Sequence, residues 1–172
     1  MGHTGPPLLR KLPVWHKVNA KWQEGMMSIP DTVSADSLMG GSAVFPQSPR
    51  SAFEWIAVVR HGISARALDA MLKSIGMSQA ELAEALDIPE RTLARRKREG
   101  ILSREESAKL LRLARVAARA AEVFEDLDLA LAWLKTPLAA LEDAAPISVL
   151  DTDIGAESVM DTLGRIEHGV FS

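Results

Sequence analysis

The stretch that decides the fold is residues 77–100, which reads MSQAELAEALDIPERTLARRKREG. Leucine and alanine recur in its first half at the three- and four-residue spacing of one helix face. The sequence Asp87-Ile88-Pro89 then interrupts this period, and a second helical pattern follows it. Two helices joined by so short a turn must cross steeply, and the small Ala83 permits their approach. The sequence therefore predicts a helix-turn-helix.

Local signals mark both helices. Ser78 can cap the first helix, while Pro89 suits the first turn of the second because its missing N–H has no helical partner there. Glu90 favours the positive end of the second helix dipole. Asp87 tolerates a left-handed backbone better than most residues do, so we expect a slightly strained turn at this position.

The second helix carries a basic outer face of a size that fits the DNA major groove. In that groove arginine can read guanine edges, and lysine or arginine can hold phosphates. An ordinary helical hairpin with a solvated basic face is the alternative. The predicted DNA-binding residues are Ser78, Gln79, Arg91, Thr92, Arg95, Arg96, Lys97 and Arg98.

Charge is segregated along the chain, although the net charge is only −3. Residues 89–119 hold ten Lys and Arg against four Asp and Glu, whereas residues 120–172 hold two against eleven. DNA would attract the first segment and repel the second. This asymmetry predicts two different partners for the two halves.

Composition favours a soluble cytoplasmic protein. The chain has 172 residues, 47% of them hydrophobic, but no apolar run approaches the roughly 20 residues that span a bilayer. Its first residues lack the apolar core of a secretory signal. The absence of cysteine excludes disulfides and thiolate metal sites and fits a reducing compartment.

Residues 1–50 hold six of the nine prolines and a Gly-Gly-Ser run, which predicts an extended or weakly ordered N-terminal arm. Part of this arm could instead form an amphipathic helix that docks on a partner or a neighbouring subunit. A poorly ordered leader that precedes an alternative start at Met26 or Met27 is the other interpretation. The apolar face of such a helix would comprise Val14, Trp15, Val18 and Trp22.

Helical patterns fill the remainder of the chain. One helix is predicted from Ser51 to Gly62, with Phe53, Trp55, Ile56 and Val59 as its apolar positions, and another from about Ser64 to Gly76. A long alanine-rich helix should follow the Ser103 cap and end near Phe124. Its small residues suit either a dimer contact or hinge, or packing inside one subunit, and its arginines should extend the basic surface. Asp126 is expected to cap a further helix that ends at Thr136. After a packed loop, a last helix should run from about Ala156 to His168, with Gly169 as its left-handed C-cap.

Residues 77–100 resemble the Cro/Xre helix-turn-helix, in which S-Q-x-x-L-A-x-x-L leads to a hydrophobe and then T-L-x-R. Asp87 replaces the glycine usual in that turn. From about Ser103 onward the chain resembles the Xre/MbcA/ParS toxin-binding domain. The residues that carry this second resemblance are Arg112, Ala114, Arg115, Ala120 to Phe124, Ala132-Trp133-Leu134, Thr136-Pro137, Leu141, Pro146, Leu150-Asp151-Thr152, Gly155, Val159, Leu163, Ile166 and Gly169.

The resemblance implies an all-α protein with a helix-turn-helix DNA-binding domain at 51–102 and a small α-helical toxin-binding domain at 103–172. It also implies an antitoxin of a type II toxin–antitoxin pair, whose partner is a RES-domain toxin that degrades NAD or a related ADP-ribosylating enzyme. In that family the C-terminal segment closes the toxin's substrate pocket, and the helix-turn-helix represses the operon. The residues expected to contact the toxin are Arg165, Glu167, His168, Gly169, Val170, Phe171 and Ser172.

We expect a homodimer on double-stranded operator DNA, within a larger toxin–antitoxin complex, with no membrane partner. No enzymatic activity, cofactor or metal is predicted. Asp151-x-Asp153-x-Gly155 begins like a calcium loop, but Thr162 stands where the bidentate glutamate should be. The alternative function is a stand-alone dimeric regulator whose acidic half serves only dimerisation or another protein partner.

Overall fold

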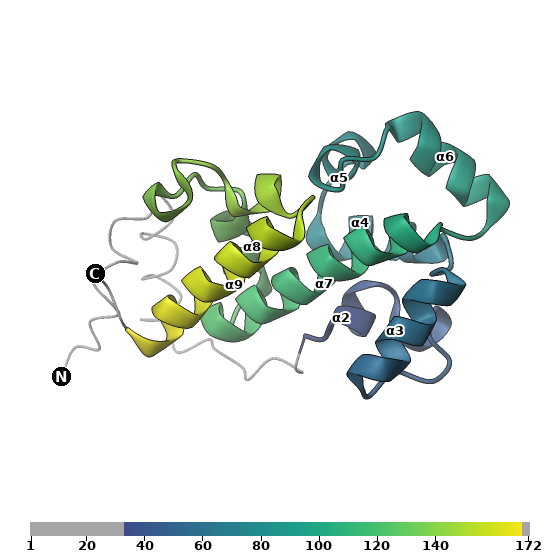
Figure 1. Cartoon of the computed structure of the whole chain (residues 1–172), viewed down its shortest axis with the longest axis horizontal. Helices are drawn as coiled ribbons and strands as arrows, with labels where there is room; N and C mark the ends of the chain where they lie inside the picture. The colour runs from purple at the N-terminus through teal and green to yellow at the C-terminus, as the bar shows by residue number, and fades with distance from the viewer. Residues whose placement is uncertain (1–32, 170–172) are drawn as a thin grey trace.

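The structure is a computed structural model that describes residues 33–169. Over this range the chain is helical, with two isolated β-bridges and no strand (Figure 1). None of the helices in this range is long and apolar enough to cross a membrane. The α-helices are α2 Ala35–Leu38, α3 Ala52–His61, α4 Arg66–Ile75, α5 Gln79–Ala85, α6 Glu90–Glu99, α7 Arg104–Phe124, α8 Leu127–Leu134 and α9 Asp153–His168, and the 3₁₀ turns are η2 Gly41–Ala43, η3 Ala139–Leu141 and η4 Pro146–Val149.

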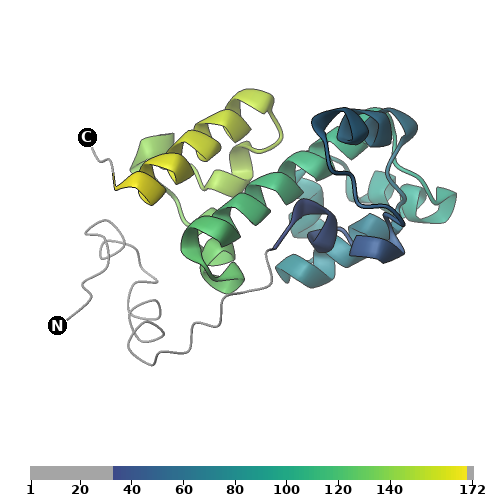
Figure 2. The same ribbon diagram turned by 90° about the horizontal axis from the view of Figure 1, so that it is seen from below.

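The long helix α7 joins the two parts of the molecule. Its N-terminal portion lies beside α2 and α3, and its C-terminal portion lies beside α8 and α9 (Figures 1 and 2). Ser103 caps the helix by accepting from the Glu106 N–H at 3.2 Å, as predicted. One continuous hydrophobic core runs along its buried face and includes Leu110, Leu113 and Phe124. The helix α7 therefore links the two parts of the described chain through one shared core.

The buried alanines of α7 pack against other helices of the same chain. Ala114, Ala117, Ala120 and Ala121 are each at most 3% exposed, on a helix against which α8 and α9 pack. Small side chains let these backbones approach closely. At these four positions packing within one chain is the interpretation observed, because no open surface remains there. The fifth small residue of this set, Ala118, is partly buried.

The helix-turn-helix comprises α5 and α6, supported by α4. Ser78 caps α5 as predicted and forms a capping box with Glu81, with Ser78 Oγ 3.2 Å from the Glu81 N–H and Glu81 Oε2 2.7 Å from the Ser78 N–H. Asp87 has a φ of 47°, which confirms the left-handed turn expected there. Ile88 and Leu93 are buried in the angle between the helices. These apolar contacts fix the crossing of α5 and α6.

The prediction of an extended or weakly ordered arm is wrong for residues 33–50. This segment forms α2 and η2, and it buries Leu38, Met39 and Phe45 in the main core. Proline and glycine mark its turns, but three large apolar side chains are enough to hold it against the folded chain. The possible helix around Trp15 lies outside the described residues, as does the rest of 1–32.

Two of the four apolar positions of the first predicted helix do not face the core. Trp55 and Val59 of α3 pack on the core, whereas Phe53 and Ile56 are 83% and 43% exposed. The helix has apolar residues on both sides, so helical periodicity alone does not select the inward one. A tertiary contact determines which side of the helix faces inward, because Trp55 packs edge to face on Phe45 with ring centroids 5.4 Å apart.

The C-terminal helix α9 begins three residues earlier than expected. Thr152 caps it by accepting from the Gly155 N–H at 3.0 Å. A Cβ on Gly155 would lie 1.9 Å from the carbonyl oxygen of Val149, so glycine permits the close contact between η4 and the start of α9. At the other end Gly169 forms the predicted left-handed cap, with a φ of 64°.

Candidate functional site

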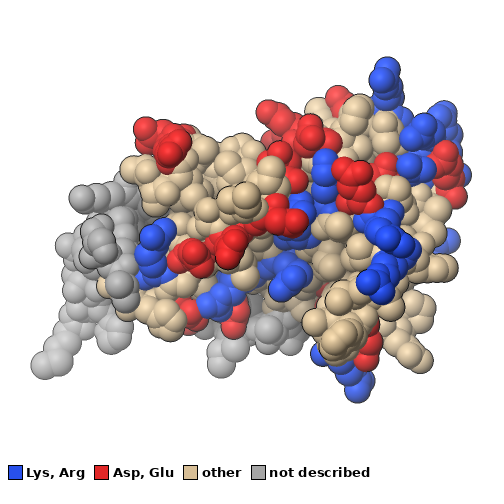
Figure 3. Space-filling model, viewed as in Figure 1, with Lys and Arg blue, Asp and Glu red and all other residues tan. Residues whose placement is uncertain are grey.

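The basic side chains of α6 divide into two groups by their surroundings. Arg91, Arg95 and Arg98 are exposed, and Thr92 is half-buried beside them. Arg95 makes only a loose contact with Glu99, with Nε 3.6 Å from the nearer carboxylate oxygen. Lys and Arg side chains gather over this end of the molecule (Figure 3). These exposed cations are the part of the predicted DNA-binding set that can meet phosphates or base edges.

Arg96 points instead toward α7. Its Nε lies 2.7 and 3.0 Å from the two carboxylate oxygens of Glu106, and its Nη1 lies 2.6 Å from Glu99 Oε2. Burial raises the pKa of the Glu106 carboxyl, but hydrogen bonds from Arg96 and from the Ser103 N–H outweigh this effect and hold the pKa below its ordinary value. The same hydrogen bonds with Glu106 and Glu99 raise the pKa of Arg96. Arg96 therefore fastens α6 to α7.

Lys97 fastens α6 to the other two helices of the motif. Its Nζ lies 2.7 Å from Asp69 Oδ1 on α4 and 2.9 Å from Gln79 Oε1 on α5. Gln79 is thus engaged within the fold, and the Ser78 hydroxyl is engaged as a helix cap. Of the eight predicted DNA-binding residues, only Arg91, Thr92, Arg95 and Arg98 share the outer side of α6. The other four, Ser78, Gln79, Arg96 and Lys97, make contacts within the fold that hold the motif in shape.

The arginines of α7 do not form a continuous basic surface. Arg112 donates to Asp153 and to the carbonyl oxygens of Leu150 and Asp151, the latter two at 3.2 and 3.0 Å. Arg119 donates to Glu122 and Glu167, and these contacts raise its pKa. Acidic side chains of α9 therefore pair with two of the arginines that were expected to extend the basic surface along α7.

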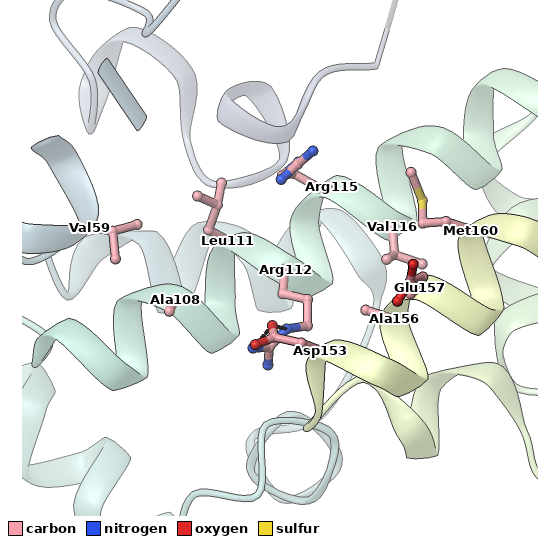
Figure 4. A pocket seen from close by; sticks show the side chains of 10 residues that line it. All are labelled: Val59, Ala108, Leu111, Arg112, Arg115, Val116, Asp153, Ala156, Glu157 and Met160. Carbon is pink, nitrogen blue, oxygen red and sulfur yellow. Dashed lines mark hydrogen bonds and ion pairs between the residues drawn. The ribbon is translucent and has the colours of Figure 1, made fainter. Parts of the chain in front are cut away.

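A cavity of about 250 Å³ opens between α3, α7 and α9 (Figure 4). Arg112 and Asp153 both line it and form an ion pair with each other at its edge. Its wall is apolar around Leu111, Val116 and Met160 and carries charges of both signs, so it has no strong preference for an ion. The lining residues are Val59, Ala108, Leu111, Arg112, Arg115, Val116, Asp153, Ala156, Glu157 and Met160.

The predicted toxin-binding residues lie at the far end of α9. Arg165, Glu167, His168 and Gly169 are exposed. Arg165 donates to Thr162 Oγ1 at 3.1 Å, and Glu167 is held by Arg119. Residues 170–172 lie outside the described part of the chain. The described positions cluster around the last turn of α9, at the end of the molecule opposite α6 (Figure 1).

Known proteins with this organisation are antitoxins. Residues 54–115 match the family described as the antitoxin Xre-like helix-turn-helix domain, and residues 119–169 match the antitoxin Xre/MbcA/ParS C-terminal toxin-binding domain. Antitoxin Xre of Yersinia enterocolitica is 37% identical over 116 residues, which cover 66% of this chain and 78% of the relative. The chain belongs to the Xre antitoxin family.

Other relatives of the antitoxin agree with this assignment. Antitoxin Xre of Photorhabdus laumondii is 32% identical over 118 residues, which cover 67% of this chain and 80% of the relative. The Prs ADP-ribosylating antitoxin of a Sphingobium species is 27% identical over 127 residues, or 68% and 80% of the two chains. A chain in the crystal structure of the M. tuberculosis MbcT–MbcA toxin–antitoxin complex aligns with a TM-score of 0.50 and 26% identity, covering 63% of this chain and 96% of that one.

The two family matches cover the helix-turn-helix and the C-terminal helices of the described chain. The matched segments meet within α7, so one helix carries both the end of the helix-turn-helix domain and the start of the toxin-binding domain. The protein is an antitoxin with a toxin-binding domain, as the sequence resemblance implied.

Proposed function

We propose that the antitoxin neutralises a RES-type NAD-degrading toxin through its C-terminal segment and binds its own operator through α6. The observation that carries this proposal is the separation of two exposed surfaces by α7. Arg91, Arg95 and Arg98 lie at one end, and the last turn of α9 lies at the other. One chain could therefore hold DNA and toxin together without overlap between the partners.

The proposed toxin contacts are Arg165, Glu167, His168 and Gly169 at the end of α9, followed by residues 170–172. A pocket that evolved to hold the pyrophosphate of NAD is cationic, and the carboxylates of an acidic domain can compete for it. Residues 120–172 supply that acidity. The Sphingobium relative is named for ADP-ribosylation, which supports an ADP-ribosylating partner as the broader class.

The proposed DNA contacts are Arg91, Thr92, Arg95 and Arg98. One short recognition helix covers only a few base pairs, so we expect a dimer on an inverted repeat. Occupancy of the operator would repress the operon that encodes the antitoxin and its toxin.

The test uses co-expression with the neighbouring toxin gene. The full chain should relieve toxin-induced growth arrest, and deletion of residues 165–172 should abolish the relief while operator binding persists. Arg98→Ala is the matched control at the opposite end, because it should weaken operator binding and leave relief intact. Relief by the truncated chain would exclude neutralisation by the C-terminal segment.

The alternative is a stand-alone regulator whose acidic half only dimerises or binds another protein. It predicts operator binding with no relief of toxicity by the full chain. The absence of a toxin gene beside the antitoxin gene would also favour it.

A further inference from the structure

Helix α3 presents an apolar face to solvent. Phe53 is 83% exposed and Ile56 is 43% exposed, and the exposed Ala57 and Arg60 lie about one and two turns after Phe53 on the same face. At 100° per residue these four positions lie within about 100° of one another. Large exposed apolar side chains that share one helix face commonly mark an interaction surface.

The opposite side of α3 is firmly held. Trp55 packs edge to face on Phe45, and Val58 and Val59 pack on the core that lies along α7. Ser51 caps the helix by accepting from the Glu54 N–H at 3.2 Å. The exposed face is therefore the outer side of an ordered helix whose inner contacts are complete.

We propose that this face binds the same face of a second copy, with the two α3 helices antiparallel about a two-fold axis near Ile56 and Ala57. This pairing rests on the proposed function in that it supplies the dimer which operator binding requires. A two-fold interface uses one patch twice, so the patch must complement itself. Ala57 lets the helices approach, and Phe53 of each copy would lie level with Arg60 of the other, in reach of a cation–π contact.

Charge placement supports the antiparallel direction. Glu54 and His61 lie on the same flank of the exposed face, near opposite ends of α3. Rotation about the two-fold axis places this flank of both copies on the same side of the interface, with the two helices running in opposite directions. Glu54 of one copy then lies beside Arg60 and His61 of the other, twice per dimer. A parallel two-fold pairing would instead place the Glu54 side chains on opposite flanks, and it would bring the two copies of Arg60 level with each other near the centre of the interface.

The position of α3 is compatible with DNA binding by both copies. In Figure 1, α3 and α6 lie on opposite sides of the N-terminal end of α7. Pairing through α3 therefore leaves the exposed arginines of α6 uncovered. The same arrangement leaves the end of α9 open to a toxin.

Sedimentation of the full-length chain over a wide concentration range tests the pairing. Phe53→Ser and Ile56→Ser should each weaken self-association by about tenfold or more, the scale expected for exposing an apolar side chain twice per dimer. Ile154→Ser is the matched control, because Ile154 is 78% exposed on α9, outside the proposed interface. Circular dichroism should show unchanged folding, since all three side chains are at least 43% exposed.

A charge exchange tests the direction. Glu54→Arg and Arg60→Glu should each weaken the homodimer, because each places like charges in contact twice. Mixing the two variant proteins should restore association as a heterodimer, in which both cross-pairs again join opposite charges. Failure of the mixture to associate would overturn the antiparallel pairing.

The results separate this inference from the proposed function. If the wild-type chain dimerises and Phe53→Ser does not change its affinity, α3 pairing is overturned, while a dimer on the operator stands. If the wild-type chain stays monomeric at every concentration, both the pairing and the proposed dimer are overturned. The latter result would assign the face to another occupant, such as the toxin or residues 1–32. Neutralisation of the toxin is unaffected in either case and is measured separately.

Discussion

The Nε of Arg96 lies within 3.0 Å of both carboxylate oxygens of Glu106, which ties α6 to the first turn of α7. Glu106 also accepts from the Ser103 N–H at 2.7 Å, so the same carboxylate caps α7. The orientation of α6 and the start of α7 thus depend on one acidic side chain.

Adjacent arginines of α6 should respond differently to removal. Arg95→Ala should leave the melting temperature nearly unchanged, because the side chain is exposed, and should weaken operator binding by about 1–3 kcal/mol if it reads a base. Arg96→Ala should lower the melting temperature because it leaves Glu106 without its cation. Thermal unfolding and operator titration at fixed salt measure both effects. Unchanged stability in Arg96→Ala would contradict its assigned role.

The link between Arg96 and Glu106 should weaken in acid. The pKa of Glu106 is lowered in the fold, so its stabilisation is complete above the ordinary glutamate value of 4.5 and is lost as the pH falls from there through the lower folded-state pKa. Glu106→Gln should therefore be less stable than the wild type near neutral pH, and this difference should shrink at about pH 3. Melting temperatures at the two pH values give the measurement. A constant difference would show that the charge of Glu106 contributes nothing.

Replacing two glycines of α9 by alanine should have opposite effects on stability. Gly155→Ala should destabilise the chain by about 1–3 kcal/mol, because the added Cβ would meet the carbonyl of Val149 at 1.9 Å and force the backbone apart. Gly164→Ala has open space around its Cβ and should stabilise the helix by about 0.5–1 kcal/mol. Denaturant unfolding compares them. Equal effects would mean that contact with η4 is not what requires glycine at 155.

Arg112 should hold the start of α9 in place. Its guanidinium satisfies the carbonyl oxygens of Leu150 and Asp151 and binds Asp153, so Arg112→Ala should cost about 1–2 kcal/mol and increase hydrogen exchange at the Gly155 amide. Arg115→Ala, one turn away on the same helix, removes an exposed cation and should change stability by less than about 0.5 kcal/mol. If both variants exchange alike, the Arg112 contacts do not order this turn.

Local signals in the sequence predicted the elements well. The capping residues Ser78, Ser103 and Asp126, the left-handed turn at Asp87 and the terminal Gly169 all take their predicted roles. Each depends on neighbours within a few residues, so the sequence pattern contains the whole interaction. The family resemblance likewise rested on order and spacing along the chain.

The sequence did not predict which basic side chains of α6 are exposed and which are paired within the fold. Arg95 and Arg96 are adjacent and chemically identical, and only contact with Glu106, ten residues away across Gly100, distinguishes them. The packing of Met39 and Phe45 was missed because proline and glycine in the surrounding segment suggested disorder, whereas burial depends on the surface that α4 and α7 offer.

The sequence by itself determined the helices after residue 50, most of their caps, the helix-turn-helix and the segregation of charge between the two halves, because these follow from residue type and spacing. The tertiary structure decided which side of α3 faces solvent, which arginines remain free for DNA and how α9 meets η4. Those outcomes depend on contacts between side chains that are distant in sequence, and such contacts are defined only once the chain is packed.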